Sequence, residues 1–192
     1  MTKRPAPLVF SNRVPEPADH RRDAAIVRRL VNGDPQALAD LYDAHAARLF
    51  RHGLALTGRR ADAEDLVQTV FLKLATTGAP LLAIRHMPAY LHRILRTAWL
   101  DVRKRPVSSR EQQVDMAADR ATAESPNLTE MAIDVAGGLA RLPAAQREIV
   151  ALHLGEGFSF REAGRMTGVS MFTAASRYRA ALQQLRQIMG GR

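Results

Sequence analysis

The side chains best suited to chemistry are basic residues near the carboxyl end of the chain. Arg177, Arg179 and Arg186 lie between Ser170 and Ile188, a stretch without a single acidic residue. A guanidinium group binds phosphate through paired N–H donors, so this stretch could bind a nucleic acid. The residues expected opposite the apolar face of this helix, or flanking that position, are Phe172, Thr173, Ser176, Arg177 and Arg179. An ordinary amphipathic helix with a solvated basic face is the alternative.

A second basic group combines cations with an aromatic ring. In residues 89–105, Trp99 is predicted to flank a strip that carries Arg96 and Arg103. Phosphates need positive charge and an unpaired base can stack on a ring, so this surface also suits nucleic acid. The alternative is that Trp99 completes the core and the arginines are solvated. The predicted outer face is His92, Arg93, Arg96, Leu100 and Arg103, followed by Lys104 and Arg105, and the predicted inner face is Leu91, Ile94, Leu95, Ala98 and Val102.

A third set forms a polar strip with one large apolar member. In residues 61–75, the predicted buried stripe is Leu66, Val67, Val70, Phe71 and Leu74. Asp65, Gln68, Thr69 and Leu72 lie on the opposite side. A solvated face with an incidental leucine is common. The more specific hypothesis is a surface for a protein partner, with Leu72 as its apolar contact.

Residues that support catalysis or metal binding are not arranged in any recognisable pattern. The six histidines are scattered, with none three or four positions from another, and there is no cysteine. No Ser-His-Asp constellation or glycine-rich phosphate loop occurs. We therefore expect binding without catalysis, and neither a metal nor another cofactor.

The first basic group lies in a helix-turn-helix pattern. Ser159 precedes Glu162 by three residues, which is the spacing of a capping box at a helix start. Gly168 suits the left-handed end of this short helix, and Ser170 can cap the next one. The second helix of such a pair usually enters the DNA major groove.

Helical periodicity extends over the rest of the chain. Helices are predicted from near Asp23 to Val31, over 35–56, 61–75 and 88–105, from Leu128 to Leu139, and from Pro143 to Leu154, with an irregular segment at 81–84. The predicted fold is all-α, with two small helical domains joined by a flexible linker. The predicted limits are an extension at 1–20, a first domain at 21–105, a linker at 106–127 and a second domain at 128–192.

Charge and composition restrict the partners. The formal net charge of +9 and a pI near 11.0 favour a polyanion, with nucleic acid ahead of a membrane surface. No apolar run approaches a membrane span, and no signal-peptide core follows Lys3 and Arg4. The lack of cysteine fits a reducing compartment. We expect a cytoplasmic protein associated with the nucleoid.

Several segments, in order, resemble bacterial RNA polymerase sigma factors of the small extracytoplasmic-function (ECF) group. In the first domain these are DPQALADLYDAHAARLF, DAEDLVQTVFLKL and AYLHRILRTAWLDVRKR. In the second they are LARLPAAQREIVALHLGEGFSFREAG and the helix-turn-helix. The resemblance implies a subunit that binds core RNA polymerase and recognises and opens promoter DNA. It also implies an anti-sigma factor as a further partner.

The resemblance assigns roles to the three sets of residues. The residues implied to bind core polymerase are Asp65, Gln68, Thr69 and Leu72. Those implied to bind the downstream promoter element are Arg93, Arg96, Thr97, Trp99, Arg103 and Lys104. Those implied to bind the upstream element are Ser170, Phe172, Thr173, Ser176, Arg177 and Arg179.

The sequence departs from the family pattern in both domains. Thr97 replaces a usual asparagine, and Ala163 and Gly164 replace the usual Ile-Ala pair. Glycine costs a helix about 1 kcal/mol relative to alanine, so we expect a less stable or differently packed second domain, with Phe158, Phe160 and Phe172 filling part of the space. The alternative functions are a stand-alone helix-turn-helix regulator and a degenerate sigma-like interaction protein.

Overall fold

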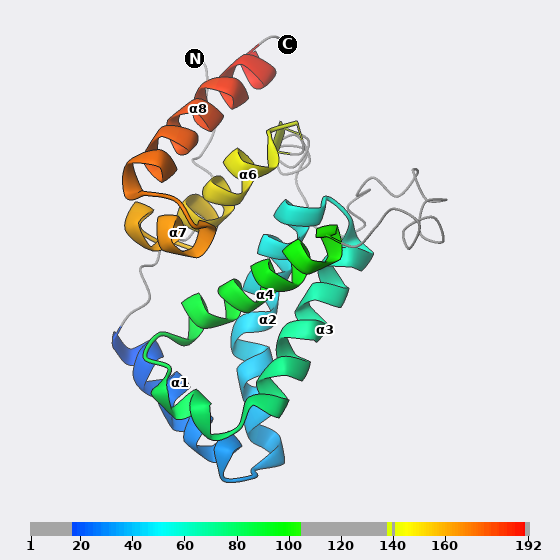
Figure 1. Ribbon diagram of the computed structural model, residues 1–192, viewed down its shortest axis with the longest axis vertical. Helices are drawn as coiled ribbons and strands as arrows, with labels where there is room; N and C mark the ends of the chain where they lie inside the picture. Colours follow the sequence, from blue (N-terminus) through cyan, green and yellow to red (C-terminus); the bar gives the residue numbers. More distant parts are fainter. Residues whose placement is uncertain (1–16, 105–137, 140, 191–192) are drawn as a thin grey trace, which may run out of the picture.

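The described part of the protein is helical. The computed structural model describes residues 17–104, 138–139 and 141–190, and no strand occurs within these ranges (Figure 1). The all-α prediction is confirmed. The predicted linker and nearly all of the helix predicted from Leu128 to Leu139 lie outside the described residues.

The N-terminal domain consists of four α-helices and one short 3₁₀ helix. They are α1 (Pro17–Val31), α2 (Pro35–Thr57), α3 (Arg60–Thr77), η1 (Ala79–Ala83) and α4 (Met87–Lys104). In Figure 1, α2, α3 and α4 lie side by side, and α1 crosses their lower end next to η1. The apolar stripe predicted for α3 is buried in full, together with Leu41, Leu49, Leu91 and Leu95 from α2 and α4. This core fixes the directions in which the outer faces of α3 and α4 point.

Local signals in the sequence set both ends of α2. The Asp34 carboxylate accepts a hydrogen bond from the Gln36 backbone N–H at 2.9 Å, which caps α2 ahead of Pro35. Gly58 ends α2 with a φ of 72°, a left-handed conformation that favours glycine. Both ends agree with the sequence prediction.

Three details of the first domain differ from the prediction. The first helix begins at Pro17, inside the extension predicted for residues 1–20. The segment predicted to be irregular, 81–84, overlaps η1. The predicted faces of α4 are wrong at two positions, because His92 is buried and Val102 is exposed.

The C-terminal domain contains the predicted helix-turn-helix. Its elements are α6 (Ala144–Val150), the π-helical turn η4 (Ala151–Gly155), α7 (Phe160–Thr167) and α8 (Met171–Gly190). Phe158 and Leu152 are fully buried, and Ile149, Ala163, Met166 and Ala174 complete this cluster. The capping box at Ser159 and Glu162 is present, and Gly168 ends α7 with a φ of 73°. Phe172 was expected to fill space in this domain but is 76% exposed.

Gly164 has a packing role at the turn of the helix-turn-helix. A Cβ at this position would lie 2.8 Å from the backbone oxygen of Val169 and 3.3 Å from that of Ser170. The turn between α7 and α8 therefore lies directly against the glycine. A side chain here would push the two helices apart, so glycine permits the close approach.

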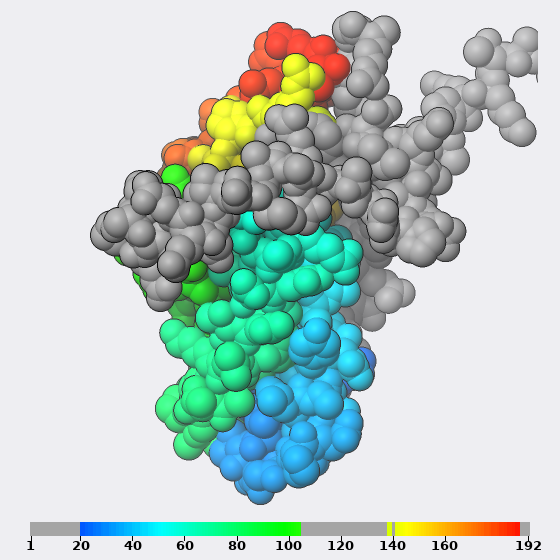
Figure 2. Space-filling model, turned by 90° about the vertical axis from the view of Figure 1, so that its right-hand side faces the viewer, coloured from blue at the N-terminus to red at the C-terminus, as the bar shows by residue number. Residues whose placement is uncertain are grey.

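The two domains pack against each other. Helices α2 and α4 contact α6, η4 and α7, so the C-terminal domain covers one face of the N-terminal domain. Figure 2 shows the N-terminal domain (blue to green) below and the C-terminal domain (yellow to red) above.

Candidate polymerase and nucleic-acid interfaces

The outer face of α3 presents the predicted polar strip to solvent. Asp65, Gln68 and Thr69 are exposed, and the Leu72 side chain is 69% exposed. The Thr69 hydroxyl donates to the Asp65 backbone oxygen at 2.8 Å, which orients it along the helix. Since the stripe on the other side of α3 is buried, the strip lies on a rigid support with an apolar side chain at one end.

The exposed side of α4 carries most of the second basic group. Arg93, Thr97, Arg103 and Lys104 are exposed, whereas Trp99 belongs to the core and is 9% exposed. The Arg103 guanidinium carbon lies 4.9 Å from the centre of the Trp99 ring. Most of the Trp99 side chain is therefore part of the core, as in the alternative interpretation. The Arg103 guanidinium group lies over the Trp99 ring.

A groove between α3 and α4 joins residues from two of the predicted sets. It has a volume of about 860 Å³ and is lined by Asp65 and Thr69 from α3 and by Thr97, Trp99 and Arg103 from α4. The C-terminal domain closes part of its rim with Ala144 and Arg147. The sequence did not predict that these two sets would share one groove, because they are separated by a turn and η1.

Arg96 differs from the exposed basic residues of α4 because its side chain is held by hydrogen bonds. Its Nε donates to Glu148 Oε1 at 2.6 Å, and a second guanidinium nitrogen donates to the Thr167 backbone oxygen at 3.1 Å. Both acceptors belong to the C-terminal domain. A predicted DNA-binding residue is thus held by its own chain.

The outer face of α8 carries the predicted upstream set. The Ser170 hydroxyl accepts from the Thr173 backbone N–H at 3.0 Å and caps the helix, as predicted. Phe172, Thr173, Ser176 and Arg179 are exposed, and Arg177 is half-buried. Burial raises the pKa of the nearby Glu148 carboxyl group, and the guanidinium groups of Arg96 and, less strongly, Arg177 oppose that effect.

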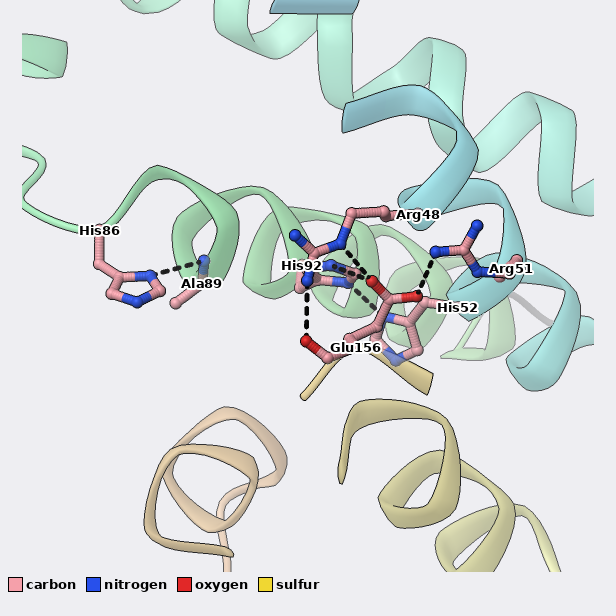
Figure 3. Close-up of polar contacts among 7 residues, drawn as sticks. All are labelled: Arg48, Arg51, His52, His86, Ala89, His92 and Glu156. Carbon is pink, nitrogen blue, oxygen red and sulfur yellow. Dashed lines mark hydrogen bonds and ion pairs between the residues drawn. The ribbon is translucent and has the colours of Figure 1, made fainter. Parts of the chain in front are cut away.

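Sequence analysis missed the residues that join the domains. Glu156 Oε2 accepts from Arg48 Nε at 2.6 Å, and Glu156 Oε1 lies 3.3 Å from an Arg51 nitrogen. Figure 3 shows both arginines extending from α2 toward Glu156. Burial raises the pKa of Glu156, and the two guanidinium groups oppose that effect. Periodicity cannot pair residues that are 108 positions apart, so the only available signal was a lone acid between Gly155 and Gly157.

Two buried histidines lie beside Glu156. The Nδ1 atoms of His52 and His92 are 2.9 Å apart, so one ring donates a hydrogen bond to the other. Burial lowers the pKa of His52 to about 3, with a smaller contribution from the Arg96 guanidinium. Burial also lowers the pKa of His92, helped by His52 and the nearby arginines. Both rings are therefore neutral near pH 7 and belong to the packing between the domains.

Within the described ranges, no group of His, Asp and Glu side chains could hold a metal ion. The same ranges contain no helix with the length and apolar character needed to cross a membrane.

Comparisons with known proteins match both domains. A family model described as Sigma-70 region 2 matches residues 41–106, and one described as Sigma-70, region 4 matches residues 138–187. The ECF RNA polymerase sigma factor SigE of Mycolicibacterium smegmatis is 30% identical over 187 residues, which cover 91% of this chain and 70% of that protein. SigM of Mycobacterium tuberculosis is 31% identical over 191 residues, 97% of this chain and 94% of that protein.

A solved structure has the same arrangement of helices. The sigma factor RpoE of Bartonella quintana, in complex with the anti-sigma factor NepR, is 25% identical with a TM-score of 0.61. The match covers 79% of this chain and 97% of that one. Two region models in the family's order and relatives matched over most of their length agree with the geometry described above. The chain belongs to the ECF sigma factors, the subunits that direct RNA polymerase to initiate transcription at promoters.

Proposed function

We propose that this sigma factor divides its task among three surfaces on α3, α4 and α8. The strip of Asp65, Gln68, Thr69 and Leu72 binds core RNA polymerase. The observation that carries this assignment is the 69% exposure of Leu72 on a helix whose opposite side is fully packed. A large exposed apolar side chain beside polar ones is typical of a contact that is buried when a protein partner binds.

The downstream promoter element is bound at the groove between α3 and α4. Arg93 and Lys104 supply positive charge at the surface, and Arg103 lies over Trp99 in the groove. An unpaired base could stack on the Arg103 guanidinium group, which the Trp99 ring supports from the other side, and this would offset the cost of unstacking the base from DNA. Thr97 lines the same groove and offers a single hydroxyl where the family usually has an amide. Arg96 joins this set once its contacts with the C-terminal domain are released.

The upstream element is bound by α8 in the major groove. Ser170, Thr173 and Ser176 offer hydroxyl groups to phosphates or base edges, and Arg177 and Arg179 offer guanidinium groups. Phe172 is exposed at the start of the helix and can contact the methyl group of thymine. The assignment is supported by the capped, turn-fixed geometry of α7 and α8.

The domain limits predicted from the sequence fit this division of tasks. Residues 21–105 hold two of the surfaces, residues 128–192 hold the third, and residues 106–127 connect them. The linker would pass through the polymerase between two promoter elements about two DNA turns, roughly 70 Å, apart. We place the protein in the cytoplasm, at the nucleoid, with an anti-sigma factor as a further partner.

Run-off transcription with purified core polymerase tests the proposal. We expect specific transcripts from a genomic promoter library when the protein is added to core enzyme. Replacing Arg177 and Arg179 together by Ala should abolish these transcripts while leaving co-purification with core polymerase unchanged. Failure to obtain any specific transcript would refute the function, and failure to recover core polymerase would favour a stand-alone regulator.

A further inference from the structure

A small pocket in the N-terminal domain lies apart from the three surfaces on α3, α4 and α8. Residues of α1, η1 and the start of α4 line it, at the lower end of the domain where α1 passes beside η1 (Figure 1). Its volume of about 270 Å³ lies below the roughly 300–1,000 Å³ of pockets that hold drug-sized ligands. This volume suits a small metabolite.

One carboxylate in the lining of the pocket has an oxygen without a partner among the described residues. Asp23 is 5% exposed, and its Oδ1 lies 3.0 Å from Nε2 of His45 in α2. This contact orients the carboxylate and leaves the buried Oδ2 atom without a hydrogen bond. A buried carboxylate is costly unless its oxygens are paired, so Oδ2 requires an N–H or O–H donor.

A second unpaired atom belongs to His20, one helical turn before Asp23. His20 lines the same pocket, and its buried Nδ1 has no hydrogen-bond partner in the described ranges. The His20 ring packs on the ring of His86, with ring centres 4.5 Å apart. His86 is held in turn because its Nδ1 accepts from the Ala89 backbone N–H at 3.3 Å (Figure 3). Two polar atoms on adjacent turns of α1 are therefore available to a ligand with several N–H donors.

The rest of the lining supplies apolar walls and positive charge. The buried side chains of Val27, Leu81 and Met87 form apolar parts of the wall. Arg28 and Arg85 line the same pocket, and both are exposed and without an ion pair to another described residue. Guanidinium groups bind carboxylates through paired N–H donors. A matching ligand therefore has N–H donors, an apolar body and an anionic group.

A free amino acid with an apolar side chain combines these three features in a small molecule. We propose that the pocket between α1 and η1 binds such an amino acid. Its ammonium group donates to Asp23 Oδ2 and His20 Nδ1, its side chain packs on the apolar walls, and its carboxylate binds Arg28 and Arg85. The ligand bridges α1 and the segment before α4. This inference is independent of the proposed polymerase and promoter contacts.

Titration calorimetry of the full-length protein without polymerase tests the proposal. The probes are L-leucine, L-isoleucine, L-methionine and L-phenylalanine, and we expect at least one to bind with a Kd below about 1 mM. The 2-oxo acid of that amino acid lacks the ammonium group, and its amide lacks the carboxylate. Each should bind about tenfold more weakly, because a charged hydrogen-bonding group is lost. Failure of all four probes to bind, or equally tight binding of the 2-oxo acid or the amide, would overturn the proposal.

Variants of the lining locate the site. Arg28→Ala with Arg85→Ala should weaken binding about tenfold. Ala24→Phe should abolish binding, because Ala24 lines the pocket from an exposed position and a phenyl group there would fill it. The matched control is Arg21→Ala with Arg22→Ala, which removes two exposed arginines of α1 outside the lining and should bind normally.

Thermal unfolding separates loss of the site from loss of the fold. Each variant should unfold near the temperature of the parent protein, since the replaced side chains are exposed. The unfolding temperature of the parent should rise with the concentration of the bound amino acid, because the ligand binds only the folded state. Binding that survives in both the arginine variant and Ala24→Phe would place the ligand elsewhere and refute the assignment.

Discussion

At the scale of single residues, the contact between the two domains determines which ring nitrogens of His52 and His92 carry protons. Either His52 or His92 can supply the proton between the two Nδ1 atoms. If His92 supplied it, His52 would carry a buried Nε2–H, and that atom has no hydrogen-bond partner among the described residues. If His52 supplies it, His92 directs its Nε2–H toward Glu156, 3.9 Å away. A buried N–H group without an acceptor is rarer in proteins than a buried acceptor without a donor. The arrangement in which His52 donates to His92 is therefore favoured.

Acid should destabilise the protein through His52. The pKa of this residue is about 3 in the folded protein, below the ordinary value of 6.5, because the ring is buried. The folded state therefore binds fewer protons than the unfolded state between these values, and stability falls as the pH falls below about 6.5. Between about pH 7.5 and 5.5 the loss from His52 alone should be about 1.4 kcal/mol.

Urea unfolding of the parent protein and of His52→Leu at these two pH values checks the prediction. The leucine variant should lose less stability on acidification, although it starts lower because the hydrogen bond to His92 is gone. An identical loss in both proteins would show that His52 does not titrate in this range.

Leu72 should matter for binding and not for stability. Replacing it by Asp leaves the core unchanged, because the side chain is exposed, and surface changes usually alter stability by less than about 0.5 kcal/mol. The charge should weaken binding to core polymerase at least tenfold, as expected for the apolar centre of an interface. Titration with labelled core enzyme measures this. Leu82→Asp, at another exposed leucine, is the matched control and should bind normally.

At the scale of elements, the sequence predicted what is decided locally. The caps at Asp34, Ser159 and Ser170 and the glycine ends at Gly58 and Gly168 depend on residues within one helical turn. The buried stripe of α3 could be predicted from the helical spacing of its apolar residues alone. The outer face of α4 was predicted less well because a second domain covers part of it. His92 is buried between His52 of α2 and Phe158 of the C-terminal domain.

Gly164 should resist replacement by alanine despite the higher helix propensity of alanine. The new Cβ would lie 2.8 Å from the Val169 oxygen, and the turn would have to shift. We expect Gly164→Ala to cost about 1–3 kcal/mol, since overpacking outweighs a propensity gain of about 1 kcal/mol. Thermal unfolding of the full chain measures this. Gly155→Ala is the matched control, since its Cβ would meet nothing within 4 Å, and an equal loss in both variants would contradict the steric explanation.

At the scale of the whole molecule, sequence reasoning described the surfaces and missed their mutual arrangement. The pairs Arg48–Glu156 and Arg96–Glu148 are 108 and 52 positions apart, and no local pattern links such residues. Each glutamate looks like an ordinary polar residue in its own helix or turn. Its partner becomes evident only when the two domains are placed together.

Binding to core polymerase should open the molecule. If the two domains bind promoter elements about 70 Å apart, as we propose, they cannot stay in direct contact, and the ion pairs at Glu148 and Glu156 must break in the complex. With a donor and an acceptor dye on cysteines introduced at the exposed positions Ala75 of α3 and Gln183 of α8, we expect energy transfer to fall when core polymerase is added. A dye pair within the N-terminal domain, at the exposed positions Arg22 and Ala75, should report no change. Unchanged transfer between the domains in an active polymerase complex would show that the closed arrangement is kept during transcription initiation, and the division of promoter contacts between α4 and α8 would then be wrong.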